Sequence, residues 1–248
     1  MEISTARPPD REGEHDGLAY RLWLPYQHQR PPQTPRPDHA PGVVIVHGAS
    51  SRKENHSDFA QLATAAGWGA LTFDLPGHGP SLPEMSGNAV QDVVRMVRLL
   101  GDQDGVDARR VAVRGSSLGG FLAIHAAASS DEVAGVIAIC PADERELARG
   151  VRSARFEMRI GDPLGLEAWL TAQDSGRAVV RIAGRPLILL HAEGDIQVPF
   201  DHSEELYARA GDPRKLVIVP GGTHTSIQHD AELQAMALLW LERNLRGG

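Results

Sequence analysis

Short apolar segments alternate with segments of helical periodicity along most of the chain, and this alternation limits the folds open to it. The apolar segments are typical of strands and lie at residues 43–46, 69–73, 111–113, 133–139, 187–190 and 216–219. After the second of these, one buried helical stripe is formed by Val90, Val93, Val94, Val97 and Leu100. Strands that are apolar on both faces and separated by helices indicate a mainly parallel sheet covered on both sides. We therefore expect an α/β fold.

The remaining segments fit this pattern. Residues 18–24 alternate in polarity, which predicts an early strand paired with the opening residues. Residues 27–42 hold five prolines and should form a loop, because proline cannot donate to a strand ladder. Helices are expected at 58–66 and 118–128, and a last helix turns Leu233, Met236, Leu239 and Trp240 toward the core. Without any visible internal repeat, residues 1–248 are expected to form a single domain.

Residues 141–186 break the rhythm, because they are far more than the dozen or so residues that a crossover between parallel strands needs. This segment is rich in arginine and predicts one helix at 164–173. One interpretation is a short helical lid inserted over the carboxyl edge of the sheet. The other is a pair of packed surface helices with no role in binding.

Charge and composition exclude several classes of function. Lys and Arg number 25 against 32 Asp and Glu, a net charge of −7, which gives no electrostatic reason to bind nucleic acid or anionic lipid. No apolar run approaches the roughly 18 residues that span a bilayer, and residues 1–17 lack the apolar core of a secretory signal. The one cysteine, Cys140, cannot form an internal disulfide. We expect a cytoplasmic protein with no membrane or nucleic-acid partner.

The segment Gly115-Ser116-Ser117-Leu118-Gly119-Gly120 carries the strongest chemical signal. It follows an expected strand and opens an expected helix. A sharp turn between the two needs glycine on both sides and lifts Ser117 out of the sheet edge. At a helix N-terminus, free N–H groups also favour developing negative charge. This context predicts a nucleophilic serine.

A serine hydroxyl needs a base, and the base needs an orienting carboxylate. His224 lies in the glycine-rich segment that follows the strand at 216–219, and Asp195 lies just after the strand at 187–190. Together with Ser117 they fall at one end of neighbouring parallel strands, where open α/β sheets place their sites. The candidate catalytic residues are therefore Ser117, Asp195 and His224.

Other residues compete for these roles. For the acid, Asp143 and Glu193 also follow strands, and Asp195 could merely form a turn. For the base, the rivals are His229 at the start of the last helix, His191 at a strand end, and His202 at the start of a helix.

The segment His47-Gly48-Ala49-Ser50 follows another strand. Its glycine permits a turn that aims a backbone N–H inward. With the N–H of Leu118, that of Ala49 would form an oxyanion hole, and Ser50 is the alternative donor. His47 is expected to brace the turn rather than to catalyse.

A metal site at Asp74 and His78 is disfavoured because no third ligand has a matching spacing. No phosphate-binding or dinucleotide fingerprint is present. Cys140 is expected in the core. We expect no metal and no organic cofactor.

Taken together, the segments HGAS, DLPGHGPS, GSSLGG, HAEGDIQVP and GGTH resemble the α/β-hydrolase superfamily over residues 18–245. They are similar to small serine esterases and to dienelactone-hydrolase-like and prolyl-oligopeptidase-like catalytic domains. The resemblance implies an eight-stranded sheet with only the second strand antiparallel, and it implies the triad and oxyanion donors named above. Dienelactone hydrolase proper uses a cysteine nucleophile, whereas this chain has Ser117.

The expected activity is a serine carboxylesterase that cleaves small to medium esters through an acyl-enzyme. The same triad also serves a thioesterase, an amidase or peptidase, or an acyltransferase, and a non-catalytic binding module is a third reading. Activity of an esterase should rise with pH as the catalytic histidine loses its proton, because only neutral imidazole is a base.

Overall fold

The computed structural model describes residues 7–25 and 39–245. Its eight strands are β1 (Arg11–His15), β2 (Leu18–Trp23), β3 (Ala40–Val46), β4 (Gly69–Phe73), β5 (Val106–Ser116), β6 (Val136–Ile139), β7 (Leu187–Ala192) and β8 (Arg214–Val219). The α-helices are α1 (Ser57–Ala65), α2 (Ala89–Gly101), α3 (Leu118–Ser129), α4 (Glu144–Arg152), α5 (Pro163–Thr171), α6 (Ser175–Arg181), α7 (Asp201–Arg209) and α8 (Ala231–Leu245). Two short 3₁₀ helices are η1 (Lys53–His56) and η2 (Ser226–His229).

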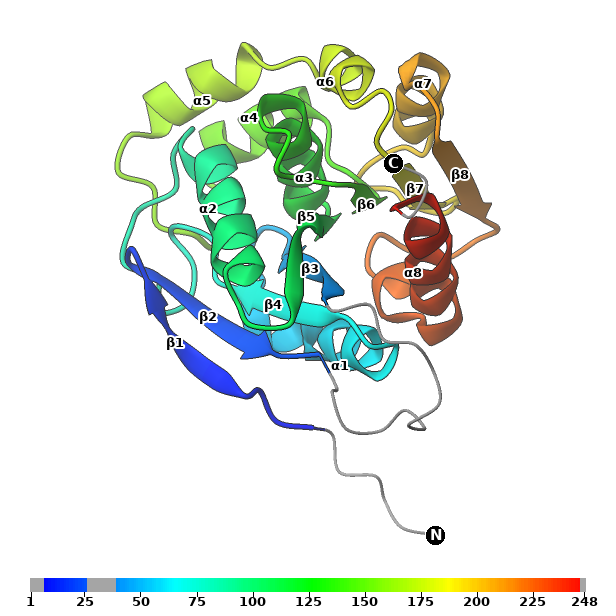
Figure 1. Cartoon of the computed structure of the whole chain (residues 1–248). Coiled ribbons are helices and arrows are strands. Elements are labelled where there is room, and N and C mark those ends of the chain that lie inside the picture. The colour runs from blue at the N-terminus through cyan, green and yellow to red at the C-terminus, as the bar shows by residue number, and fades with distance from the viewer. Residues whose placement is uncertain (1–6, 26–38, 246–248) are drawn as a thin grey trace, which may run out of the picture.

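All eight strands form one sheet in the order β1-β2-β4-β3-β5-β6-β7-β8. β2 runs antiparallel to both β1 and β4, and every other pair is parallel. The expectation of an eight-stranded α/β-hydrolase sheet with only the second strand antiparallel is therefore confirmed. The carboxyl ends of β3, β5, β6, β7 and β8 consequently meet along one edge (Figure 1).

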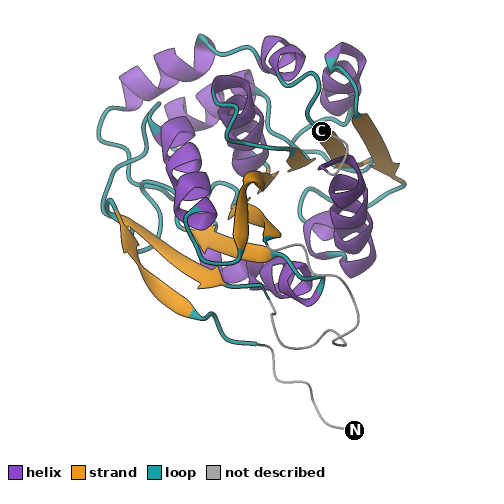
Figure 2. Cartoon of the chain, viewed as in Figure 1, coloured by secondary structure: helices purple, strands orange, loops and turns teal. Residues whose placement is uncertain are grey.

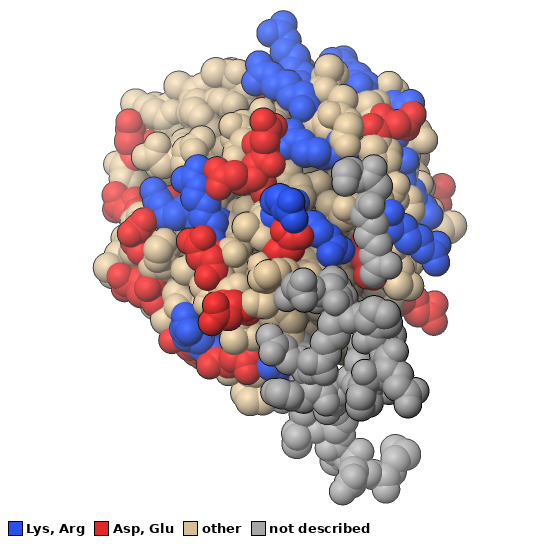
Figure 3. All heavy atoms as spheres, in the orientation of Figure 1, with Lys and Arg blue, Asp and Glu red and all other residues tan. Residues whose placement is uncertain are grey.

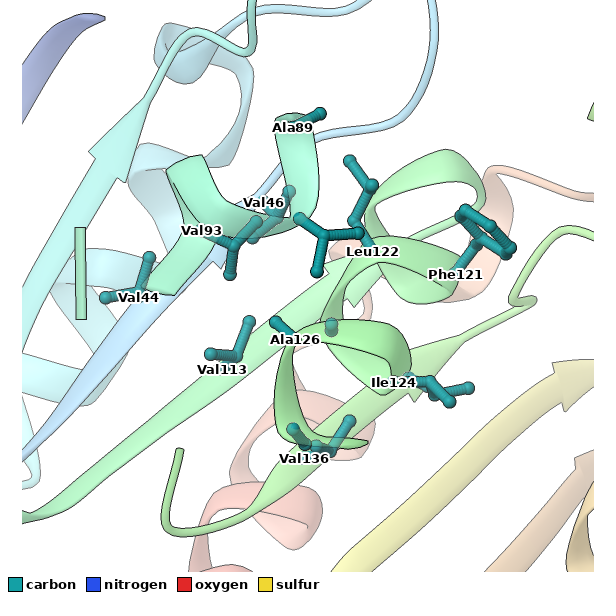
Figure 4. Packing of buried hydrophobic residues seen from close by; sticks show 14 of the residues in the cluster. Val44, Val46, Ala89, Val93, Val113, Phe121, Leu122, Ile124, Ala126 and Val136 are labelled. Carbon is teal, nitrogen blue, oxygen red and sulfur yellow. The ribbon is translucent and has the colours of Figure 1, made fainter. Parts of the chain in front are cut away.

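Helices cover both faces of this sheet (Figure 2). Because side chains alternate along a strand, Val44 and Val46 of β3 pack in the apolar cluster that holds α2 and α3. Val43 and Ile45 point the other way, into the cluster that holds α1 and α8. Figure 4 shows part of the first cluster, in which Val44 and Val46 of β3 lie near Val93 of α2. The continuous apolar runs are thus strands buried on both faces.

Several boundaries differ from the sequence expectation. β5 begins at Val106 rather than at residue 111, and β6 begins at Val136 rather than at 133. Polar residues at the start of β5 lie at the exposed end of the strand, so the apolar pattern alone misses them. The predicted strand at 18–24 corresponds to β2, and its partner is β1. The predicted proline-rich loop at 27–42 lies mostly outside the described residues.

The segment 141–186 contains three helices rather than the one that the sequence predicts. α5 matches the expectation, whereas α4 and α6 were not predicted. Asp143 and Asp174 accept hydrogen bonds from backbone N–H groups at the starts of α4 and α6, which caps these short helices. We call residues 141–186 the lid, and in Figure 1 its helices lie along the top of the molecule.

None of the helices described in residues 7–25 and 39–245 is both long enough and apolar enough to cross a bilayer. On the face shown in Figure 3, acidic and basic side chains both occur across the surface.

Candidate active site

Ser117 lies between the end of β5 and the start of α3 in a strained backbone conformation, with φ 54° and ψ −119°. The flanking glycines make this turn possible. A Cβ at Gly115 would lie 2.0 Å from the Gly119 carbonyl oxygen, and one at Gly119 would lie 2.2 Å from the Val46 carbonyl oxygen. Both contacts are far too short for any larger residue. Ser117 therefore stands on a turn that only this glycine pattern allows.

His224 and Asp195 meet at the same edge of the sheet. Asp195 follows β7 and His224 follows β8, and Nδ1 of His224 donates to Oδ2 of Asp195 at 2.6 Å. The loop before His224 folds back through Gly221 and Gly222, whose φ angles are 66° and 75°. Donation through Nδ1 leaves Nε2 as the acceptor nitrogen. The imidazole is thus held in the tautomer that a general base requires.

The carboxylate of Asp195 is almost completely surrounded by donors. Its Oδ1 accepts from the backbone N–H groups of Gln197 and Val198 at 2.9 and 3.0 Å. Oδ2 lies 3.4 Å from Nε2 of His191, a fully buried residue. Burial disfavours the charge, but hydrogen bonds from His191, His224 and Val198 outweigh it and hold the pKa of Asp195 well below its ordinary value. Asp195 is therefore a fixed anion behind His224.

The role of His191 beside Asp195 was missed by the sequence reasoning, which treated His191 only as a rival base. Its Nε2 donates to the Val198 carbonyl at 2.9 Å, and its Nδ1 accepts from Ser203 Oγ at 2.6 Å. The signal available in the sequence was its position four residues before Asp195 at the end of the same buried strand.

Ser117 follows β5 and His224 follows β8, and β6 and β7 lie between these two strands in the sheet. Because the four strands are parallel, both residues lie at the same edge. The Ser117 N–H donates to the Ile139 carbonyl of β6 at 3.0 Å. No hydrogen bond joins Ser117 Oγ to His224 in this structure, although both residues are described. Such bonds are often long in free enzymes and shorten when substrate binds.

Next to Ser117, two backbone N–H groups are available as hydrogen-bond donors. Neither Ala49 nor Leu118 donates its N–H to another described residue. The alternative donor, Ser50, already donates to His78 Nε2 at 3.3 Å. Gly48 lies against Ser117, because a Cβ there would be 3.3 Å from the Ser117 Cβ. The geometry thus favours Ala49 over Ser50.

His47 is buried beneath this turn and ties it to the neighbouring loop. Its Nδ1 donates to the Gly48 carbonyl at 2.7 Å, and its Nε2 accepts from the Leu75 N–H at 3.0 Å. Burial lowers the pKa of His47 to about 3, so the ring stays neutral. Both ring nitrogens are occupied, which matches a bracing role.

Asp74 and His78, the disfavoured metal pair, have other partners. Oδ2 of Asp74 accepts from Lys53 Nζ at 2.6 Å, and Oδ1 accepts from the Lys53 N–H at 2.8 Å. His78 donates through Nδ1 to the Pro76 carbonyl. The buried Lys53–Asp74 ion pair was not anticipated from the sequence. It fixes the start of η1, close to the turn at residues 48–50.

The rival acids and bases lie elsewhere. Asp143 caps α4, and the Glu193 carboxylate accepts from the Gly221 N–H at 3.4 Å. His229 pairs with Asp58, with 2.9 Å between Nδ1 and Oδ2. His202 lies in the first turn of α7, with Nε2 buried and without a partner among the described residues. None of these side chains contacts Ser117.

Cys140, the residue after β6, lies next to Asp195 and His224. Among the described residues, Cys140, Asp195 and His224 are the group of three possible metal ligands whose ligand atoms lie close together, within 4.8 Å. Burial raises the pKa of the Cys140 thiol to about 12, which disfavours the thiolate that a metal needs.

An apolar pocket, which we call the inner pocket, opens beside Leu118 and lies beneath the lid. Its water-accessible volume is only about 10 Å³. The lid supplies Leu147 and Val151 from α4 and Trp169 from α5, while α2 and α3 supply Ala89 and Leu122. The lid therefore covers an apolar space next to a proposed oxyanion donor.

Comparisons with known proteins agree with this architecture. Residues 43–237 match the model of the alpha/beta hydrolase family. A curated relative, YfhR of Escherichia coli O157:H7, is described as uncharacterized and is 25% identical over 220 residues, which cover 84% of this chain and 70% of that protein.

Two solved structures share the fold. Est1E of Butyrivibrio proteoclasticus with bound ferulic acid superposes with a TM-score of 0.74 at 20% identity, covering 96% of this chain and 100% of the other. Acetyl xylan esterase 1 of Thermoanaerobacterium sp. JW/SL YS485 gives a TM-score of 0.68 at 18% identity, with coverage of 90% and 79%. With the family model matched over most of its length, the chain belongs to the alpha/beta hydrolase family.

Proposed function

We propose that this protein is a serine hydrolase that cleaves carboxylic esters through an acyl-enzyme. The observation that carries the proposal is the pairing of a strained Ser117 with the Asp195–His224 hydrogen bond of 2.6 Å at the same sheet edge. The esterase among the structures with this fold supports it as well.

In the first half of the reaction, Ser117 Oγ attacks the ester carbonyl carbon while Nε2 of His224 takes the hydroxyl proton. The carbonyl oxygen becomes an oxyanion, which the N–H groups of Ala49 and Leu118 stabilise. His224 then gives its proton to the departing alcohol oxygen as the carbon–oxygen bond breaks. Asp195 stabilises the imidazolium throughout.

In the second half, water loses a proton to His224 and attacks the acyl carbon. The new oxyanion collapses, the bond to Ser117 Oγ breaks, and His224 returns the proton to the serine. A carboxylic acid and the free enzyme result. No step requires a group beyond these side chains and backbone donors.

The test combines covalent labelling with turnover. A fluorophosphonate probe should label the wild type and fail to label Ser117→Ala, and hydrolysis of p-nitrophenyl butyrate should fall by about 10⁴-fold or more in that variant. Ser116→Ala is the matched control, because Ser116 is the adjacent serine and its buried hydroxyl has no partner among the described residues. Equal labelling of wild type and Ser117→Ala would refute the assignment.

The choice among esters, thioesters and amides is tested with the same enzyme. Rates with p-nitrophenyl esters, acyl-CoA thioesters and aminoacyl anilides, measured side by side, should rank esters first. A higher kcat/KM for thioesters or anilides would reassign the reaction while keeping Ser117 as nucleophile.

A further inference from the structure

Two hollows lie on either side of one lid residue, Trp169 of α5. It lines the inner pocket, which opens beside Leu118, and it also lines a second, open hollow that we call the outer cleft. The outer cleft is polar and is bordered by Gln91, His125, Asp174, Arg177 and Arg181. The side chain of Trp169 thus borders an apolar space on one side and a polar surface on the other.

The indole ring is held firmly in this place. A Cβ built on Gly87 would lie 2.7 to 2.9 Å from three ring atoms of Trp169, so the Gly87 backbone packs directly against the indole. The ring also meets Phe121 of α3 edge-on, with 6.0 Å between centroids. Because α3 and the loop before α2 both contact the indole, it forms a rigid wall between the inner pocket and the outer cleft.

The inner pocket is narrow. Its space has room for about one water molecule between the side chains, so it accepts only a small group as it stands. Met85 and Met158 are part of its wall, and their flexible side chains allow small adjustments. Ala89 and Leu122, on the neighbouring helices α2 and α3, narrow it further (Figure 4).

The direction of the reaction assigns this pocket to one side of the substrate. The departing alcohol oxygen must lie next to His224, which follows β8. The inner pocket is lined by Leu118, the residue after Ser117 at the start of α3, whereas neither Asp195 nor His224 lines it. The inner pocket is therefore the candidate space for the acyl group of the ester, which stays on Ser117.

We propose that Trp169 is the end wall of an acyl pocket and restricts the enzyme to esters of short-chain carboxylic acids. This inference rests on the proposed ester hydrolysis. Replacing the indole by a small side chain joins the inner pocket to the outer cleft, and long acyl chains then pass through the gap into solvent.

The experiment is a chain-length series of p-nitrophenyl esters, from acetate and butyrate to octanoate and dodecanoate. In the wild type, kcat/KM should fall by at least about tenfold between butyrate and octanoate, since an apolar pocket commonly discriminates chain lengths by such factors. In Trp169→Ala, kcat/KM for octanoate should rise by about tenfold or more, while the value for acetate stays within about threefold.

Matched variants distinguish the effect of removing the Trp169 wall from an effect on the stability of the lid. Trp240→Ala removes a partly buried indole of α8 that packs against the other apolar cluster, and it should leave the chain-length profile unchanged. Trp169→Phe keeps an aromatic wall and should keep the short-chain preference. Ala89→Val narrows the inner pocket and should lower kcat/KM for butyrate more than for acetate.

The outcomes distinguish this inference from the proposed function. If Trp169→Ala stays folded and active on the acetate ester but keeps the wild-type chain-length profile, the role of Trp169 as end wall is refuted. The proposed ester hydrolysis is then unaffected. A wild-type optimum at dodecanoate likewise refutes the wall. If the wild type hydrolyses no ester and Ser117 is not labelled, the proposed function fails first. Folding of each variant is verified by urea unfolding.

Discussion

Nε2 of His191 lies 3.4 Å from Oδ2 of Asp195, the same carboxylate oxygen that accepts the hydrogen bond from His224. The ring of His191 is itself held by hydrogen bonds with the Ser203 hydroxyl and the Val198 carbonyl. The carboxylate of Asp195 therefore faces two histidines: His224, the proposed base, and the buried His191.

This arrangement predicts an effect of His191→Leu on the pH dependence of catalysis. The Nε2–H of His191 donates to the Val198 carbonyl and also faces Oδ2 of Asp195, so its loss leaves more negative charge on Oδ2, which favours the imidazolium of His224. The acid limb of the kcat/KM profile should move to higher pH, and kcat at neutral pH should fall by about tenfold. A variant that is merely less stable would lower activity without moving the limb.

His191→Gln provides the control, because its side-chain amide can restore a donor toward Asp195. It should return the limb toward the wild-type position. His125→Leu disrupts another buried histidine–serine pair, with Ser175, and should not move the limb at all. Equal shifts in the His125 and His191 variants would contradict the role of His191.

Asp195→Asn tests the acid itself. An amide keeps the size of the side chain but cannot hold the base in its tautomer or balance the imidazolium, so kcat should fall by about 10³- to 10⁴-fold with KM little changed. Glu193→Gln, two residues earlier, is the matched control and should stay within about threefold in kcat. A larger loss in the Glu193 variant would transfer the role of acid to that residue.

Gly119→Ala tests the steric requirement of the turn that carries Ser117. The new Cβ would collide with the backbone of β3, so stability should fall by about 3 kcal/mol and ester hydrolysis should be lost. Gly67→Ala is the comparison: the residue has φ 90° but nothing lies within 4 Å of the added Cβ. That variant should lose only about 1 kcal/mol in urea unfolding. Similar losses in the two variants would refute the steric argument.

Three buried histidines predict a loss of stability in mild acid. Burial lowers the pKa of His47 to about 3, of His56 to about 2 and of His125 to about 4. Below about pH 6.5 the unfolded chain binds protons that the folded chain does not, so stability falls as pH falls. Each such group contributes a slope of about 1.4 kcal/mol per pH unit.

Urea unfolding from pH 7 to 4 measures this slope. His125→Gln removes one of the three groups, so the slope between pH 6 and 4 should be smaller by about 1.4 kcal/mol per pH unit. An unchanged slope in this variant would show that His125 is protonated in the folded protein.

Much of the fold could be predicted because the strands of a covered parallel sheet are continuous apolar runs. The glycines around Ser117 and the polar residues after each strand then indicated which edge carries the chemistry. The sequence could not supply the outer part of β5, whose residues are polar because they are exposed. It also missed α4 and α6, whose short, charged sequences depend on caps at Asp143 and Asp174 rather than on periodicity.

Contacts between distant segments were the other gap. The Lys53–Asp74 ion pair joins residues 21 positions apart, and no local pattern announces it. The inner pocket is bounded by α2, α3 and the lid, so its width depends on how helices pack rather than on any one motif. Trp169 appears in the sequence only as an apolar residue of a helix.

The buried thiol of Cys140, the single cysteine, can be used to measure local opening of this protein. In the folded protein the Cys140 thiol is buried and its pKa is raised, so a disulfide reagent such as 5,5′-dithiobis(2-nitrobenzoate) should react with it very slowly. The N–H of Cys140 donates to the Leu190 carbonyl of β7, so exposure of Cys140 requires the carboxyl ends of β6 and β7 to separate. The rate of thionitrobenzoate release therefore measures the opening of the region around Asp195 and His224, without any substrate present.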